Sequence, residues 1–122
     1  MSDNHKQIWL IYCQAWKAPT AKEKRVLMEK SLNPNCVYTD PMTQTKGRDE
    51  LLAYMLKFHE DVPGGSFETT QFMTHNNRSV SRWQMRNAQN EAIGDGISYA
   101  EFDDDGRLKT MTGFFETPSQ TS

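Results

Sequence analysis

The second half of the chain carries the feature that most narrows the fold. From Ser66 onward, apolar and polar residues alternate with a period of two, and the alternation recurs in four segments. This pattern is typical of β-strands that have one buried face. The sequence therefore predicts four strands in an antiparallel meander, at 66–75, 78–87, 96–102 and 107–116.

The connections between these segments contain residues that suit hairpin turns. Asn76 and Asn77 separate the first two segments, and Asp105 and Gly106 separate the last two. Asparagine and glycine tolerate the left-handed backbone geometry that tight turns require. We therefore expect a hairpin at each of these places.

The part of the chain before Ser66 has helical spacing instead. A first helix ends before Pro19, because the residue ahead of a proline avoids helical geometry. Thr20 and Glu23 have the spacing of a capping box at the start of a second helix, and a third helix begins near Arg48. The expected inward residues of the three helices are Ile8, Ile11, Tyr12, Ala15 and Trp16; Val26, Leu27 and Leu32; and Leu51, Met55, Phe58 and Val62.

Helices and strands are thus segregated along the chain, as in an α+β domain. We expect three N-terminal helices packed on a strongly curved, mainly antiparallel sheet, which together form a cone with an internal pocket. A chain of 122 residues fits one domain, residues 1–122, with a loose tail from about Thr117.

Composition argues against several functions. Fourteen basic and sixteen acidic residues give a net charge of −2, which does not favour nucleic acid as a partner. The basic cluster Lys22, Lys24 and Arg25 is interrupted by Glu23 and is expected to face solvent. No apolar run approaches the roughly 20 residues of a membrane span. Two cysteines in apolar stretches suit a reducing compartment, and we expect a cytoplasmic protein.

Metal and cofactor signals are weak. Glu101, Asp103 and Asp105 before Gly106 imitate the first half of a calcium loop, but Thr112 occupies the position that requires a bidentate carboxylate. An acidic hairpin turn explains these residues better, and we expect no cofactor.

Asp40 ends a short strand, directly before Pro41. Two interpretations remain open. Asp40 is a turn former whose carboxylate accepts hydrogen bonds from the following backbone N–H groups, or it is an acid directed into a pocket. Burial among apolar side chains would remove hydration from the carboxylate and make it a stronger base.

The apolar stripes of the strands are equally open to two interpretations. Ser81, Trp83 and Met85 share one strand face, and Met111 and Phe115 share another. Such stripes are usually core, yet a cone lined by Met and Trp also suits an apolar ligand.

Four segments together resemble the SnoaL-like branch of the nuclear-transport-factor-2-like superfamily. They are "YTDP" with "KGRDELLAYM", "VSRWQMR" and "ISYAEFDDDGRLKTMTGFFE", and the resemblance extends from about His5 to Glu116. It implies a cone-shaped α+β fold. That fold carries isomerases, cyclases, dehydratases, epoxide hydrolases and proteins without chemistry, so it does not fix a function.

The steroid-isomerase type within this superfamily implies roles for individual residues. Asp40 matches its general base and Tyr12 its oxyanion donor. Ser98 stands where that isomerase has a neutral carboxylic acid, and an alcohol is a poorer partner for an enolate. The expected ligand-binding residues are Trp16, Met55, Phe58, Trp83, Met85, Ser98, Met111 and Phe115.

Three functional hypotheses follow. The first is a protein that binds a compact apolar molecule in the cone and transfers a proton next to a carbonyl, as an isomerase or cyclase does. The second is a binding module without chemistry, and the third is a scaffold. We also expect a homodimer through the outer sheet face, where Ile97, Tyr99 and Phe114 point. His59 and His75 are weaker candidates for reaching the pocket.

Overall fold

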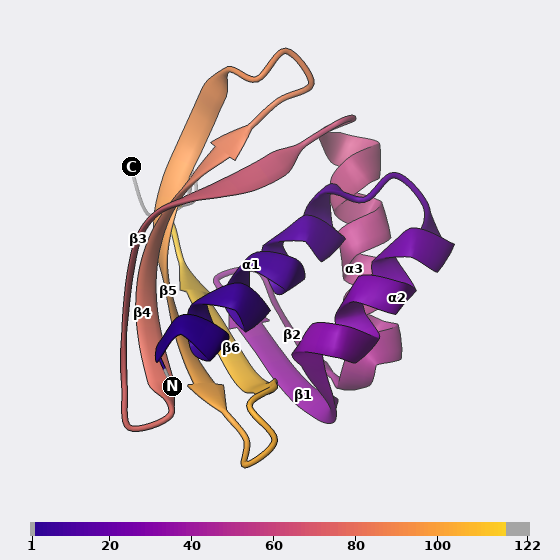
Figure 1. Ribbon diagram of the computed structural model, residues 1–122. Helices are drawn as coiled ribbons and strands as arrows, with labels where there is room; N and C mark the ends of the chain where they lie inside the picture. The colour runs from indigo at the N-terminus through magenta and orange to yellow at the C-terminus, as the bar shows by residue number, and fades with distance from the viewer. Residues whose placement is uncertain (1, 117–122) are drawn as a thin grey trace.

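Three helices cover one face of a strongly curved six-stranded sheet (Figure 1). The structure is a computed structural model that describes residues 2–116, with side chains from Asn4 onward. The helices are α1 (Ser2–Lys17), α2 (Ala21–Ser31) and α3 (Gly47–Asp61). The strands are β1 (Leu32–Asp40), β2 (Thr43–Lys46), β3 (Ser66–His75), β4 (Arg78–Arg86), β5 (Ala92–Phe102) and β6 (Leu108–Phe114). The tail expected from Thr117 lies outside the described residues, so the one-domain expectation stays a prediction.

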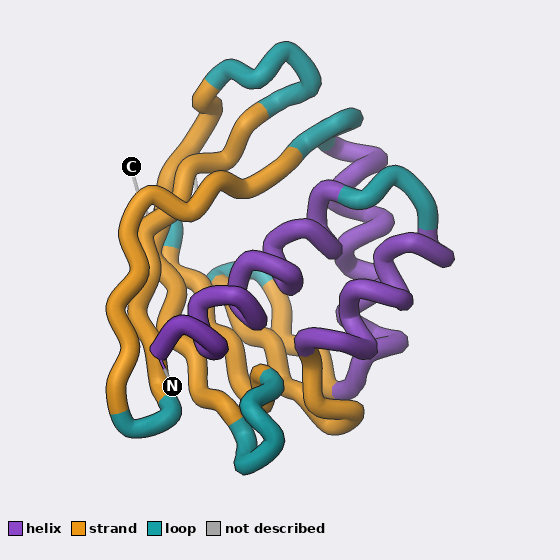
Figure 2. Tube along the Cα trace, viewed as in Figure 1, coloured by secondary structure: helices purple, strands orange, loops and turns teal. Residues whose placement is uncertain are grey.

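The strands lie in the order β2-β1-β6-β5-β4-β3. Every neighbouring pair is antiparallel except β1 and β6, which are parallel. The β3–β4 register shifts between Thr69 and Gln71, and such bulges bend a strand. The sheet bends around α1, as the tube in Figure 2 shows. The α+β class and the curved, mainly antiparallel sheet are confirmed.

Both predicted hairpin turns are present. Asn76 and Asn77 have φ angles of 48° and 60°, and Gly106 has a φ of 85°. The carboxylate of Asp103 accepts hydrogen bonds from the backbone N–H groups of Asp105 and Arg107, so it stabilises the second turn. The described residues contain no group of three or more His, Cys, Asp and Glu that could hold a metal ion.

The region around Asp40 contains more strand than the sequence indicated. β1 begins at Leu32, directly after α2, and residues 43–46 form a further strand, β2, that the sequence pattern did not predict. Pro34 lacks a backbone N–H, and the β1–β6 register shifts between Leu32 and Val37, so the proline falls in the irregular stretch. Asp40 pairs with Thr43 and thereby closes a tight β1–β2 hairpin.

The second helix departs from the prediction at Val26 and Lys24, whereas Leu27 packs against the core and Leu32 is fully buried. Val26 is 47% exposed, whereas Lys24, which was expected to face solvent, is fully buried. The Lys24 ammonium donates to the carbonyl oxygens of Ala15 and Trp16, at 2.9 and 3.0 Å. These carbonyls end α1, where backbone acceptors lack partners within the helix. A contact between one lysine and the end of a neighbouring helix does not change the hydrophobic periodicity of the sequence. That periodicity therefore could not predict the burial of Lys24.

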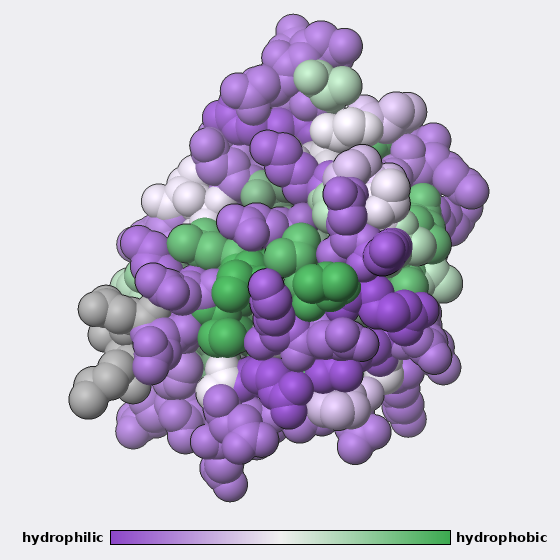
Figure 3. All heavy atoms as spheres, turned by 45° about the vertical axis from the view of Figure 1, so that its right-hand side comes forward, coloured by the Kyte–Doolittle hydropathy of each residue, from purple (hydrophilic) through white to green (hydrophobic). Residues whose placement is uncertain are grey.

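The core fills one part of the cone. Its members come from all three helices and from β1, β5 and β6, and the largest of those that are almost fully buried are Met28, Leu32, Cys36, Leu51, Met55, Phe102, Leu108 and Met111. Figure 3 shows a band of hydrophobic side chains within a mostly hydrophilic surface. None of the described helices is long and apolar enough to cross a membrane.

Candidate functional site

A cavity of about 380 Å³ lies between the inner face of the sheet and the helices. Helices α1 and α3 supply one side, and β1 and β3–β6 supply the other. The wall is formed by Trp9, Tyr12, Cys13, Trp16, Tyr38, Asp40, Met42, Tyr54, Lys57, Phe58, Asp61, Val62, Phe67, Trp83, Met85, Ile93, Gly94, Asp95, Ser98, Gly113, Phe115 and Glu116. Its size falls within the range of small-molecule sites.

Aromatic rings form a continuous wall with Trp16 at its centre. The Trp16 ring lies 5.6 Å from that of Phe58 and 5.3 Å from that of Phe67, in edge-to-face geometry. The ring centroid of Phe67 lies 5.1 Å from that of Trp83, and the centroid of Trp83 lies 6.1 Å from that of Phe115. Interlocked edge-to-face pairs stabilise one arrangement of rings, so this wall is fixed in shape.

Asp40 projects into this cavity from the end of β1. Asp40 is buried, with 8% of its surface exposed. One carboxylate oxygen, Oδ1, accepts hydrogen bonds from the backbone N–H groups of Met42 and Thr43, at 2.8 and 3.1 Å. The side chain therefore accepts hydrogen bonds from the turn, as expected for a turn former. It also faces the cavity, as expected for an acid directed into a pocket.

The second oxygen of Asp40 holds two tyrosines. Tyr38 donates its phenolic hydrogen to Oδ2 at 2.6 Å, and Tyr54 donates to the same atom at 2.8 Å. Burial raises the pKa of Tyr38, and its hydrogen bond and charge interaction with Asp40 raise it further. Burial raises the pKa of Tyr54 in the same way, again with the help of Asp40. Both phenols therefore remain donors.

These contacts fill the acceptor capacity of the carboxylate. An ionised carboxylate offers about four lone-pair sites, and Asp40 accepts two hydrogen bonds on each oxygen. Four donors stabilise the negative charge and fix its orientation. A ligand proton can reach Asp40 only after one donor leaves.

Two more polar groups face the same cavity. Tyr12 is 3% exposed, and burial raises its pKa well above the ordinary value, so it is a neutral hydroxyl. Ser98 Oγ accepts a hydrogen bond from Trp83 Nε1 at 2.9 Å, which leaves the serine hydrogen free to donate. A methyl group added at Gly113 would lie 3.8 Å from Asp40 Cβ and from Ser98 Oγ. The side chains of Asp40 and Ser98 thus both approach the backbone of β6 at Gly113.

Comparison with known proteins places the chain in a family. The profile of the SnoaL-like domain matches residues 12–111, which is most of the chain. The chain belongs to the SnoaL-like domain family.

Solved structures share the fold of this SnoaL-like chain. A candidate isomerase of the SnoaL-like family from Agrobacterium tumefaciens is 22% identical, with a TM-score of 0.86 over 94% of this chain and 99% of that one. A candidate polyketide cyclase from Sinorhizobium meliloti is 12% identical, with a TM-score of 0.71 over 88% and 93% of the two chains.

TerC, crystallised with polyporic acid, is 11% identical, with a TM-score of 0.76 over 95% and 94% of the chains. Identities this low show the fold alone. No curated protein shows a significant match.

Most of the residues expected to bind a ligand line the cavity of this SnoaL-like chain. They are Trp16, Phe58, Trp83, Met85, Ser98 and Phe115, together with Tyr12 and Asp40. Met55 and Met111, which were also expected to bind a ligand, lie in the core at 0% and 1% exposure and do not line the cavity. Strand alternation predicts that Met111 faces inward but does not predict its depth in the cone.

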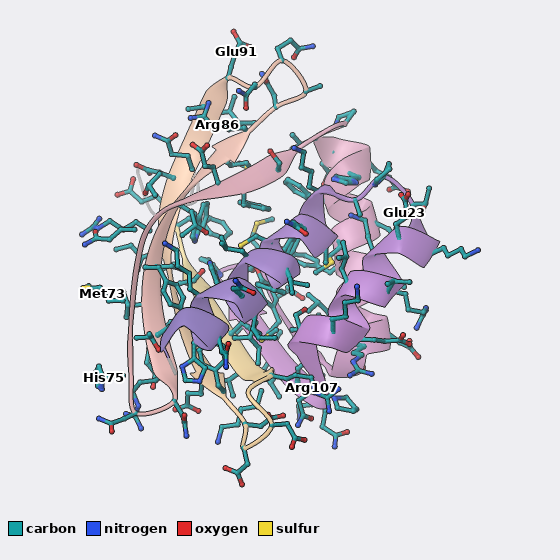
Figure 4. The ribbon with its side chains drawn as sticks, viewed as in Figure 1. Glu23, Met73, His75, Arg86, Glu91 and Arg107 are labelled. Carbon is teal, nitrogen blue, oxygen red and sulfur yellow. The ribbon has the colours of Figure 1, made fainter. Side chains whose placement is uncertain are left out.

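The two histidines do not belong to the wall. His59 lies 3.0 Å from the carbonyl oxygen of Gly65, and His75 lies beside Asn76 at the β3–β4 turn. The side chain of His75 points away from the helices in Figure 4. Neither His59 nor His75 lines the cavity.

Sequence reasoning missed the two phenols that hold Asp40. Tyr38 precedes Asp40 by two residues on the same strand, so period-two alternation could have placed it on the same face. Tyr54 has no such signal, because its contact depends on how α3 packs against β1. Trp9 and Phe67 also line the cavity and were not predicted to do so.

Proposed function

We propose that this chain binds a compact, largely apolar carbonyl compound in the cone and that Asp40 accepts a proton from the carbon next to the carbonyl. One observation carries the proposal: a buried carboxylate faces a cavity walled by aromatic rings. Tyr12 and Ser98 are the donors available to the carbonyl oxygen. This chemistry is that of an isomerase or cyclase that needs no cofactor.

The hydrogen bonds of Asp40 define how the step proceeds. Tyr54 is partly exposed, whereas Tyr38 is buried. The Tyr54 phenol therefore leaves Oδ2 when the ligand enters, and Tyr38 stays to orient the carboxylate. The C–H bond of the ligand breaks, its proton goes to Oδ2, and its electron pair forms an enolate that Tyr12 or Ser98 stabilises.

The second candidate is a binding module without chemistry. The complete hydrogen-bonding of Asp40 favours it, because all four acceptor sites of the carboxylate are occupied and none is free for a ligand proton. In that case Asp40 is a structural anchor for β1, β2 and α3. A homodimer and a cytoplasmic location are further parts of the proposal, and the outer-face residues Ile97 and Phe114 support the dimer.

Deuterium exchange distinguishes the two candidates. In deuterated buffer, 2-tetralone loses its acidic C–H signals in the proton spectrum as a base removes them. We expect the protein to accelerate this loss, and Asp40→Asn to reduce the acceleration by about two to four orders of magnitude. The matched control, Asp104→Asn, changes an exposed carboxylate outside the cavity and should leave the rate unchanged.

Binding of 2-tetralone is measured in the same samples by tryptophan fluorescence. Binding without faster exchange would replace the catalytic proposal with the binding module. Absence of both binding and exchange would count against a carbonyl ligand altogether.

A further inference from the structure

The wall of the cavity has an excess of negative charge. Lys57 is its only cationic side chain among the described residues, and no described arginine lines it. The carboxylates are Asp40, Asp61, Asp95 and Glu116. These groups give the wall a formal charge near −3, although the chain as a whole carries only −2.

One of these carboxylates is buried in the site, and the other three belong to solvent-exposed residues at its rim. Asp40 lies inside, where burial leaves little water to screen its charge. Asp61 ends α3, and its negative charge also contributes to the raised pKa of Tyr54, which places it near the inner cluster. Asp95 comes from β5 and, like Asp61 and Glu116, is exposed to solvent. A ligand that enters the cavity therefore passes exposed carboxylates at the rim and reaches a buried one inside.

Aromatic rings reinforce the effect of this charge. The faces of aromatic rings are negative and attract cations, and rings that surround a quaternary ammonium group bind it without hydrogen bonds. This property matters here because Asp40 has no free acceptor site. A group that needs no hydrogen bond can be stabilised by the charge of Asp40 and by the rings while the tyrosines stay in place.

We propose that the cone selects a compact organic cation, an amine or quaternary ammonium group on an apolar body, over a neutral molecule of the same shape, and that it excludes carboxylates. The inference rests on the ligand site of the proposed function and specifies the charge of its ligand. It holds whether or not Asp40 accepts a proton.

Three probes of similar size and different charge test the inference. Benzyltrimethylammonium is the cation, neopentylbenzene is its uncharged carbon isostere, and phenylacetate is an anion. All three tryptophans of the chain, Trp9, Trp16 and Trp83, line the cavity, so their fluorescence reports occupancy. We expect the cation to bind roughly ten-fold more tightly than the isostere and phenylacetate to bind most weakly.

A pair of neighbouring residues provides a matched control. Asp61 and Glu60 are both exposed on the same helix, but only Asp61 lines the cavity. Asp61→Asn should weaken binding of benzyltrimethylammonium about three-fold or more and leave neopentylbenzene unchanged. Glu60→Gln should change neither affinity. Equal losses in both variants would mean that only the overall charge of the protein matters, and would overturn the inference.

The outcomes separate this inference from the proposed function. If neopentylbenzene binds as tightly as the cation, or phenylacetate binds best, charge selection is wrong while the apolar ligand site stands. If none of the three probes binds, both the charge selection and the cone as a ligand site are wrong. Tighter binding of the cation that depends on Asp61 supports the inference.

Discussion

The phenol of Tyr54 donates a hydrogen bond to Oδ2 of Asp40 at 2.8 Å, across fourteen positions of sequence. This contact joins α3 to the end of β1, directly beside the cavity. Tyr38 reaches the same oxygen from within β1, at 2.6 Å. The two tyrosines therefore differ in what they connect, although they make the same kind of bond to one atom.

Replacing each tyrosine with phenylalanine should separate stability from reactivity. Tyr38→Phe removes a buried bond to a charged group and should lower the free energy of unfolding by about 1.5–3 kcal/mol. Tyr54→Phe should cost less, because Tyr54 is partly exposed, and it frees one acceptor site on Asp40. We expect faster exchange of 2-tetralone with Tyr54→Phe than with the unaltered protein, measured beside urea unfolding. Slower exchange would mean that Tyr54 assists the step instead of blocking it.

Gly113 offers a way to fill the site without strain. Its added methyl group would contact Asp40, Ser98 and Tyr38 at ordinary distances of 3.8–3.9 Å. Gly113→Ala should therefore weaken ligand binding about ten-fold or more and leave the unfolding free energy within about 0.5 kcal/mol. Calorimetric titration and thermal unfolding measure the two effects.

A neighbouring glycine provides the contrast. At Gly96 an added methyl group would overlap the indole ring of Trp83, so Gly96→Ala must displace part of the aromatic wall and should cost about 1–3 kcal/mol. If Gly113→Ala and Gly96→Ala lose stability equally, the space beside Gly113 is not open.

The outer face of the sheet leads to a prediction about assembly. Phe114 is 59% exposed, Ile97 is 36% exposed, and Met73 points away from the helices in Figure 4. Apolar groups gathered on one face often mark a contact surface. We expect a dimer by light scattering at micromolar concentration, and a monomer for Phe114→Lys. Lys109→Ala, on the same strand, should stay dimeric. A monomeric mass for the unaltered protein would contradict the dimer.

Local patterns predicted more of the fold than of the site. Alternation located the four strands of the meander, and turn residues such as Asn76 located the hairpins, because both depend on neighbours in sequence. Of the partners of Asp40, Tyr38 and the turn N–H groups are neighbours in sequence, whereas Tyr54 reaches it only through the packing of α3 against β1. Lys24 was misplaced for the same reason, since its buried contacts are carbonyls of another helix.

Lys24 should make stability depend on pH in a recognisable way. Burial lowers its pKa from 10.5 to about 8, so the folded state disfavours the charged amine. Between pH 8 and 10.5 the unfolded state binds more protons, and stability from this group rises with pH. Below pH 8 the amine is charged in both states, and its contribution to the free energy of unfolding no longer changes with pH. That contribution is then about 3 kcal/mol less favourable than at high pH.

Cys13 has the opposite effect on how the free energy of unfolding depends on pH. Burial raises the pKa of its thiol from 9.0 to about 12, so its contribution to stability falls as pH rises above 9. The effect of Lys24 must therefore be measured as the difference between the unaltered protein and Lys24→Met, which keeps the apolar stem and removes the amine. Denaturant unfolding at several pH values from 7 to 10.5 provides this difference.

We expect Lys24→Met to be destabilised at pH 10.5, because the carbonyl oxygens of Ala15 and Trp16 lose their donor. The neutral amine has two N–H donors for these two acceptors, whereas the ammonium carries a third. As pH falls to 8 the unaltered protein loses its advantage over the variant, and the two curves should converge. A pH-independent difference between the curves would mean that Lys24 stays charged in the folded protein and that burial does not shift its titration.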